Sequence, residues 1–183
     1  MKKIVALFSG EGTNLANLIE KIHQQHGLIV CAITNNPNAG GIAKAKTANI
    51  PVEICNHTLF DSRESYDTAL VEIIQKYNPD LVILCGFMRI LTPVFTSQIK
   101  AINLHPSLLP AFKGARAIER SFESDETICG VSVHWVSNEL DGGAIILQKS
   151  FTKNPADTLE EFSAKIREIE HEILPLSVIQ ILK

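Results

Sequence analysis

Apolar and polar positions along the first half of the chain predict strands and helices in alternation. Short apolar runs are typical of buried parallel strands, and we expect strands at 4–8, 28–33, 51–54 and 81–84. Apolar residues recur at helical spacing between them and predict helices over about 13–24, 42–48 and 61–77. This order is typical of a doubly wound α/β domain with right-handed crossovers.

The pattern changes after Pro110. A short buried strand that starts with Ala101 and Ile102 is expected to end where Asn103 and His105 emerge, and residues 130–136 then alternate between apolar and polar. Turn residues occupy 138–143, and 144–147 is apolar again, which predicts a β-hairpin. The sheet should therefore be mixed, with an antiparallel hairpin added to a mostly parallel body.

A long amphipathic helix is predicted at the C-terminal end, from about Thr158. Its apolar positions lie three and four residues apart, and Thr158 with Glu161 forms a capping-box pattern at its start. Pro175 lies inside the helix and predicts a kink. No linker, repeat or low-complexity segment interrupts the chain. We therefore expect residues 1–183 to form a single Rossmann-like domain.

Composition narrows the possible partners. Of the 183 residues, 45% are apolar and 20% are charged, and the net charge is only −3 without a long basic run, so no nucleic-acid partner is expected. No apolar stretch reaches membrane-spanning length, and the run at 4–8 is too short for a signal-peptide core. No two of the four cysteines lie within a few residues of each other. Buried reduced thiols in a cytoplasmic protein are the favoured interpretation.

Asn103 and His105 stand two residues apart in a segment that is expected to be extended. Alternation along a strand projects both side chains from one face, and Pro106 favours an extended His105. A carboxamide beside a titratable ring suits acyl chemistry, because one can hold a developing oxyanion and the other can move a proton. Ordinary strand-end and turn roles are the alternative.

Residues 9–15 place a glycine turn between the first strand and the first helix. Backbone amides at such a helix N-terminus suit a phosphate. A dinucleotide fingerprint is not met, because Leu15 replaces the third glycine and the second strand ends in Thr34, Asn35 and Asn36 without an acidic residue. A monophosphate site is favoured over NAD or ATP, with a tight turn that binds nothing as the alternative.

Two carboxylates are candidates for the same site. Asp141 precedes Gly142 and Gly143, and turn formation alone is the favoured explanation of all three. The functional alternative has Asp141 reach His105 and favour its imidazolium. Glu170 borders the buried face of the last helix, where it needs a partner or, more commonly, reaches solvent. The other histidines form no metal spacing and are interpreted as structural or surface residues: His23, His26, His57 and His134.

Four motifs together resemble the phosphoribosylglycinamide formyltransferases. They occupy residues 9–15, 86–91, 103–110 and 139–143, in the order and spacing of that family, and the match covers essentially the whole chain. The resemblance implies a single formyltransferase domain that moves a formyl group from 10-formyltetrahydrofolate to the amine of glycinamide ribonucleotide in purine biosynthesis. Methionyl-tRNA formyltransferases differ in the first glycine loop, and formyltetrahydrofolate deformylases add an N-terminal regulatory domain.

The resemblance also implies roles for the matching residues. The catalytic residues would be Asn103 and His105, which stabilise an oxyanion, and Asp141, which supports the imidazolium and moves a proton through water. The ribonucleotide would be held by Gly12, Thr13, Asn14, Arg167 and Glu170. The formyl folate would be held by Arg63, Met88, Arg89, Ile90, Leu91, Ser137, Asn138, Glu139 and Leu140. No metal is implied, and a monomer or weak homodimer that binds small molecules is expected.

Arg116 departs from the family pattern, in which histidine is common at this position. Its partner is left open between a substrate phosphate and an acidic neighbour. Two other functions also stay open. A hydrolase of formyltetrahydrofolate would use the same three catalytic residues with water, but would not need the phosphate loop and Glu170. A non-catalytic nucleotide-binding module would not need Asn103, His105 and Asp141.

Overall fold

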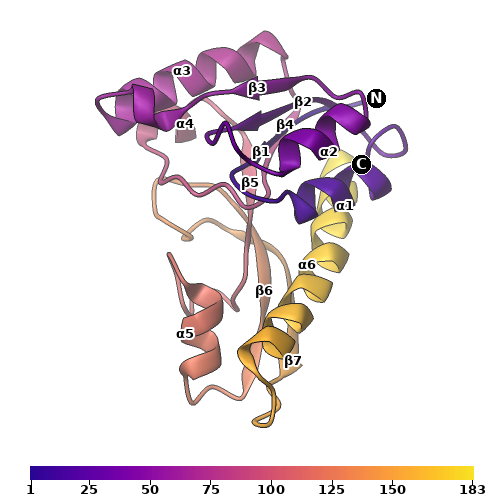
Figure 1. Ribbon diagram of the computed structural model, residues 1–183, viewed down its shortest axis with the longest axis vertical. Helices are drawn as coiled ribbons and strands as arrows, with labels where there is room; N and C mark the ends of the chain where they lie inside the picture. Colours follow the sequence, from indigo (N-terminus) through magenta and orange to yellow (C-terminus); the bar gives the residue numbers. More distant parts are fainter.

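A seven-stranded sheet with the order β3-β2-β1-β4-β5-β6-β7 organises the computed structural model, which describes residues Met1–Lys183 (Figure 1). The strands are β1 (Lys3–Phe8), β2 (Leu28–Thr34), β3 (Val52–Ile54), β4 (Leu81–Leu84), β5 (Ala101–His105), β6 (Ile128–Trp135) and β7 (Ile145–Thr152). The first five are parallel, whereas β6 pairs antiparallel with both β5 and β7. The predicted mixed sheet with a C-terminal hairpin is confirmed, although β7 extends beyond the predicted 144–147 to Thr152.

The helices cover both faces of this sheet. They are α1 (Thr13–Lys21), α2 (Gly41–Thr47), η1 (His57–Leu59), α3 (Arg63–Lys76), α4 (Pro93–Thr96), α5 (Ala117–Glu123) and α6 (Leu159–Leu182). The first helix ends three residues before the predicted end, because Gln24 adopts a left-handed conformation with φ 62° that a helix cannot contain. The sequence does not predict η1, α4 or α5; η1 and α4, at three and four residues, are too short to show a helical period.

Alternation along β1 separates two hydrophobic layers. Ile4, Ala6 and Phe8 face a core shared with α1, α2 and α6, whereas Val5 and Leu7 face a second core with α3 and α4. Helices therefore pack on both faces, as the doubly wound prediction requires. All four cysteines are free and buried, as predicted. None of the helices is long and apolar enough to cross a membrane.

The long helix α6 runs beside the β6–β7 hairpin and reaches α1 (Figure 1). It continues past Pro175, where the sequence predicts a kink, to Leu182. Pro175 has no N–H to give to the carbonyl of His171 one turn earlier. That carbonyl instead accepts hydrogen bonds from Asn17 Nδ2 at 2.9 Å and Lys21 Nζ at 3.0 Å. The proline thus frees an acceptor that ties α6 to α1.

The chain order reverses between β1 and β4, because β2 and β3 extend the sheet on one side and β4 and β5 on the other. Ligands of open α/β sheets bind outside the carboxyl ends of the strands at such a switch point. The segments that follow β1 and β4 are joined there, because the N–H of Ser9 donates to the carbonyl of Gly86 at 3.0 Å. Both segments belong to motifs that the sequence analysis selected.

Candidate active site

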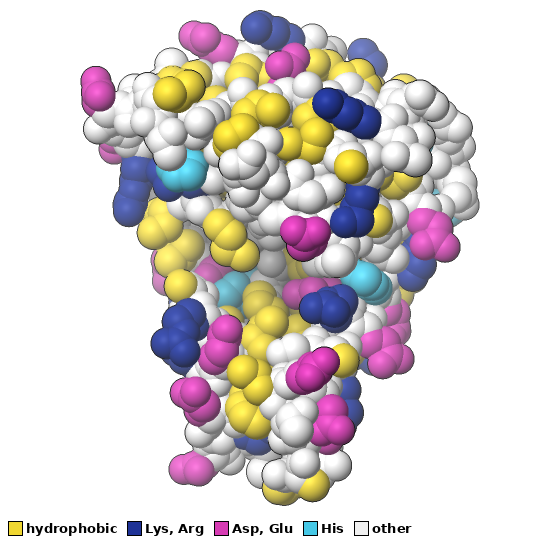
Figure 2. All heavy atoms as spheres, viewed as in Figure 1, with side chains coloured by type: hydrophobic (Ala, Val, Ile, Leu, Met, Phe, Trp, Pro, Cys, Tyr) yellow, Lys and Arg dark blue, Asp and Glu magenta, His cyan; other side chains and the backbone are white.

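A cleft of about 430 Å³ opens beyond the carboxyl ends of β4 and β5 and is closed on one side by the β6–β7 connection. Figure 2 shows a hollow between the wide upper part of the molecule and the narrower lower part, with apolar and charged side chains around it. Met88, Ile90 and Leu140 line the cleft and are 77%, 47% and 48% exposed. Large apolar side chains exposed inside a cleft indicate a ligand with an apolar body.

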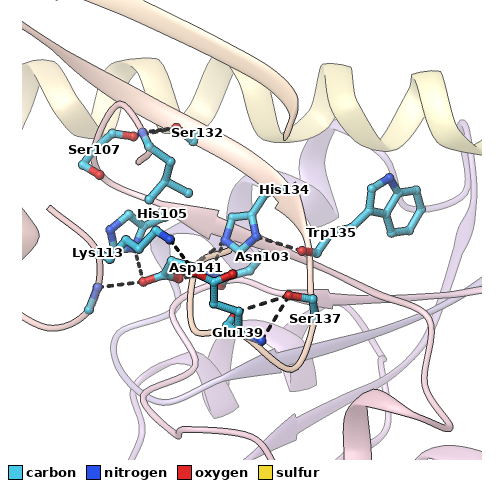
Figure 3. Close-up of polar contacts among 12 residues, drawn as sticks. Asn103, His105, Ser107, Lys113, Ser132, His134, Trp135, Ser137, Glu139 and Asp141 are labelled. Carbon is cyan, nitrogen blue, oxygen red and sulfur yellow. Dashed lines mark hydrogen bonds and ion pairs between the residues drawn. The ribbon is translucent and has the colours of Figure 1, made fainter. Parts of the chain in front are cut away.

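Asn103, His105 and Asp141 meet at the floor of this cleft (Figure 3). Asp141 Oδ2 lies 3.5 Å from His105 Nδ1, and Asp141 Oδ1 lies 3.4 Å from Asn103 Nδ2. Asp141 also has the left-handed φ of 52° of a tight turn. The turn explanation favoured by the sequence is therefore incomplete, because this residue makes the turn and also brings its carboxylate to the histidine.

His134 is a member of the same cluster and is buried there, so of the two roles predicted for it, structural or surface, the surface role is wrong. Its side chain is 3% exposed and its Nε2 lies 3.5 Å from Asp141 Oδ1 and 3.2 Å from Asn103 Nδ2. Its Nδ1 donates to the carbonyl of Trp135 at 2.9 Å, which holds a proton on that nitrogen. Antiparallel pairing makes Asn103 and His134 direct partners across β5 and β6. The polar centre therefore consists of Asn103, His105, His134 and Asp141.

The contacts in this centre favour an ionised carboxylate on Asp141. Burial alone would raise the pKa of Asp141, but the hydrogen bond with His134, the Gly114 N–H at 2.8 Å and the charge of His105 hold it below its ordinary value. His105 Nε2 donates to the carbonyl of Phe112 at 2.8 Å, and its Nδ1 faces the carboxylate. Both ring nitrogens of His105 therefore face acceptors.

The turn after His105 is anchored on the hairpin. The hydroxyl of Ser132 donates to the carbonyl of Ser107 at 2.7 Å and accepts from the N–H of Leu109 at 3.0 Å. Gln148 Nε2 donates to the carbonyl of Leu109 at 2.9 Å. These bonds from β6 and β7 fix the backbone that follows His105.

The glycine loop offers main-chain donors beside the centre. Gly12 precedes α1 with φ 71°, and an added Cβ would lie 2.6 Å from the Cα of Gly41. No side chain caps this end of the helix. The first helical bond runs from Ala16 to Gly12, so the amides of Thr13 and Asn14 have no main-chain acceptor. This arrangement suits an anion.

Glu170 lies beside this loop, so the structure brings two of the predicted ribonucleotide residues together. Asn14 Nδ2 donates to Glu170 Oε2 at 3.2 Å, and Asn14 Oδ1 is buried without a partner. Burial raises the pKa of Glu170 above its ordinary value, although the Asn14 bond and the charge of Arg167 oppose that rise. Arg167 is exposed one turn earlier on α6. The contact joins the start of α1 to the middle of α6.

The residues predicted to bind folate fall into two groups. Eight of them line opposite sides of the cleft: Met88, Arg89, Ile90, Leu91, Ser137, Asn138, Glu139 and Leu140. Arg63 does not line it, because it is the exposed first residue of α3. The main-chain N–H and C=O groups of residues 89–91 make no hydrogen bond within the protein. They remain available to a ligand with donors and acceptors along its edge.

Arg116 also lines the cleft, at the start of α5 with φ 56°. Its side chain is exposed and forms no ion pair or hydrogen bond with the rest of the chain. Of the two partners that the sequence left open for Arg116, the acidic neighbour is therefore not found in this structure. No three His, Cys, Asp or Glu side chains are arranged so that they could hold a metal ion.

Comparisons with known proteins match this chain along nearly its whole length. The family model described as "Formyl transferase" matches residues 2–178. A phosphoribosylglycinamide formyltransferase of Haemophilus influenzae is 40% identical over 97% of this chain and 86% of its own. The Escherichia coli protein of that name is 38% identical over 96% and 84%. The crystal structure of a Campylobacter jejuni protein of that name has a TM-score of 0.97 and 52% identity, covering 100% of this chain and 98% of its own.

Proposed function

Because this chain belongs to the formyl transferase family, we propose that its cleft transfers the formyl group of 10-formyltetrahydrofolate to the amine of glycinamide ribonucleotide. The similarity to phosphoribosylglycinamide formyltransferases supports formyl transfer in purine biosynthesis as the activity of this chain. The observation that carries the assignment to particular residues is the convergence of Asn103, His105 and Asp141 from two separate segments at the floor of one cleft. The alternatives of a hydrolase or a non-catalytic module are not favoured.

The chemistry of the cleft wall supports folate binding between residues 88–91 and 137–140. The pterin ring of a folate is flat and carries donors and acceptors along one edge. The unpaired main-chain groups of residues 89–91 match such an edge, and the exposed side chains of Met88, Ile90 and Leu140 match the faces of its rings. The ring would then lie between the two segments, with its formyl group toward Asn103 and His105.

The glycine loop supports binding of the ribonucleotide. Its phosphate would accept the free amides of Thr13 and Asn14 at the start of α1, where the helix dipole favours negative charge. Glu170 would accept hydrogen bonds from the neutral, hydroxyl-rich remainder of the substrate, and the unpaired Asn14 Oδ1 is a further acceptor. Exposed Arg167 adds positive charge beside the same loop. The substrate amine would then point into the cleft.

The polar centre would stabilise charge and move one proton. The bound folate supplies the formyl carbonyl, whose oxygen gains negative charge as the amine attacks. Asn103 Nδ2 and the His105 imidazolium are the donors aimed at that charge. Their contacts with Asp141, at 3.4 and 3.5 Å, are long, and such contacts tighten or exchange when substrates bind. Asp141 lies beside His105 and, through water, receives the proton that the amine loses; the proton then passes to the folate nitrogen as the bond between that nitrogen and the formyl carbon breaks.

The test is to incubate the purified protein with 10-formyltetrahydrofolate, with and without glycinamide ribonucleotide, and to follow folate absorbance. We expect turnover only when the ribonucleotide is present. Turnover at the same rate without it would identify a hydrolase and contradict the proposal. Folded protein without turnover in either mixture would support a binding module. Circular dichroism and thermal unfolding of the same sample establish that the protein is folded.

A further inference from the structure

The segment of residues 86–91 lines the cleft without forming a helix or strand of its own. It leaves β4, passes the cleft and enters α4 after Thr92. The main-chain groups of this segment do not hydrogen-bond to one another. Such a segment can hold a defined shape only if other parts of the protein fix it. Two buried polar side chains outside the polar centre do so, one near each end of the segment.

Ser9 holds the end that follows β4. Its hydroxyl accepts the N–H of Met88 at 2.7 Å and donates to Asn35 Oδ1 at 2.5 Å, so both its donor and its acceptor capacity are used. The N–H of Ser9 also donates to the carbonyl of Gly86 at 3.0 Å. Ser9 is only 9% exposed, so no water replaces these bonds easily.

Asp67 on α3 holds the other end. One of its oxygens, Oδ2, accepts the N–H of Thr92 at 2.6 Å and the hydroxyl of Thr92 at 2.8 Å. The residue is 1% exposed and its second oxygen, Oδ1, has no hydrogen-bond partner. The guanidinium of Arg89, which lies over the ring of Tyr66 at 5.5 Å, attracts this carboxylate. Burial of a carboxylate costs free energy. Both hydrogen bonds of the buried Asp67 carboxylate go to Thr92, so Thr92 is the residue that Asp67 holds in place.

We propose that Ser9 and Asp67 are positioning residues that fix the two ends of the 86–91 segment and so present its main-chain groups to the folate. This inference rests on the proposed function for the identity of the ligand. Neither side chain lines the cleft, so both act through the backbone they hold. The role differs from general stabilisation of the fold, because each side chain fixes one identified amide.

Amide hydrogen exchange of the unliganded protein tests the anchoring directly. Ser9→Ala should speed the exchange of the Met88 amide and leave that of the Thr92 amide unchanged. Asp67→Ala should do the reverse. Asp67→Asn keeps an oxygen that can accept from Thr92 and should restore part of the protection. Unchanged exchange of Met88 in Ser9→Ala and of Thr92 in Asp67→Ala would overturn the proposal.

Kinetics test the functional consequence. Loss of the bond to the Met88 or the Thr92 amide is expected to raise the KM for 10-formyltetrahydrofolate about tenfold, with a smaller change in kcat. Ser9→Thr keeps the hydroxyl and should recover most of the affinity. Matched controls are Ser97→Ala, whose hydroxyl bonds only to Pro93 in α4, and the exposed Asp125→Asn. Both should behave as wild type.

The outcomes separate this inference from the proposed function. Wild-type protein without ribonucleotide-dependent turnover contradicts the proposed function. Wild-type turnover with an unchanged folate KM in both Ser9→Ala and Asp67→Ala contradicts the positioning role. If Asp67→Ala does not fold, Ser9→Ala still decides the question, with Ser9→Thr as its rescue. Equal losses of affinity for both substrates with a lowered melting temperature would indicate a merely structural role and would overturn the proposal.

Discussion

The glycine loop after β1 and the polar centre at the end of β5 serve adjacent parts of one site but are built from different atoms. The loop presents main-chain amides, and its shape depends on the missing side chain of Gly12. The centre presents side chains, and its proposed chemistry depends on His105 beside the ionised carboxylate of Asp141. The two regions should therefore fail differently when mutated. Changes in the centre should lower turnover, whereas changes in the loop should weaken binding and the fold.

The largest expected effect is that of His105→Ala. Removing the imidazolium takes away a charged donor for the formyl oxygen, and we expect kcat to fall by about three orders of magnitude. The KM values of both substrates and the melting temperature should change little, because the ribonucleotide loop is untouched. Steady-state kinetics with each substrate varied in turn measures this. Full turnover in the variant would contradict the role given to His105.

Asp141→Asn should have the next largest effect, with kcat lowered about a hundredfold. The pKa of Asp141 is lowered in the folded protein, so its ionised form stabilises the fold above the ordinary aspartate value of 3.8. That contribution should disappear as the pH falls through the lower pKa of the folded state. Urea unfolding of wild type and variant as a function of pH measures it. If the difference in unfolding free energy between wild type and Asp141→Asn grew on acidification, the lowered pKa of Asp141 would be contradicted.

The sequence predicted most of the sheet because short apolar runs and turn residues are local signals. The ends of α1 and β7 were less accurate. Gln24 ends the helix through a backbone conformation that the composition does not reveal, and β7 gains its length from pairing with β6. Pro175 lies inside α6 as expected, and the side chains that bond to the carbonyl it leaves free come from α1, more than a hundred residues earlier in the chain.

The candidate site shows the same division. Asn103 and His105 could be selected because they share one face of a short strand. His134 could not, because its place beside Asn103 depends on the register between β5 and β6. The alternation of residues 130–136 was visible, but the residue that faces Asn103 is fixed only by tertiary pairing. Asp67 was missed for a similar reason, since it acts on Thr92 from a different element.

Gly12→Ala tests the main-chain half of the comparison. The new methyl group would lie 2.6 Å from the Cα of Gly41 at a φ of 71°, so the loop must shift. We expect a loss of about 2 kcal/mol in unfolding free energy and about a tenfold higher KM for the ribonucleotide, with kcat less affected. Gly10→Ala is the matched control, because an added Cβ there has nothing within 4 Å. Equal behaviour of the two variants would refute the steric argument.

The smallest expected effect is that of Asn17→Ala, which weakens the support of the loop from a distance. Asn17 Nδ2 donates to the carbonyl of His171 that Pro175 leaves free, and this bond holds α6, with Glu170, against α1. Because Lys21 still donates to that carbonyl, the loss should be only about 1 kcal/mol in unfolding free energy. The KM for the ribonucleotide should rise slightly, and the KM for the folate should not change.

Pro175→Ala tests whether Asn17 stabilises the protein through the His171 carbonyl that Pro175 leaves free. This substitution returns an N–H that can bond to His171 within α6, so the carbonyl no longer depends on Asn17. Asn17→Ala should then cost less in the Pro175→Ala background than in wild type, and a double-mutant cycle of unfolding free energies measures the difference. Strictly additive effects would mean that Asn17 stabilises α1 without acting through α6. The ribonucleotide subsite would then depend on the glycine loop and the Asn14–Glu170 contact alone.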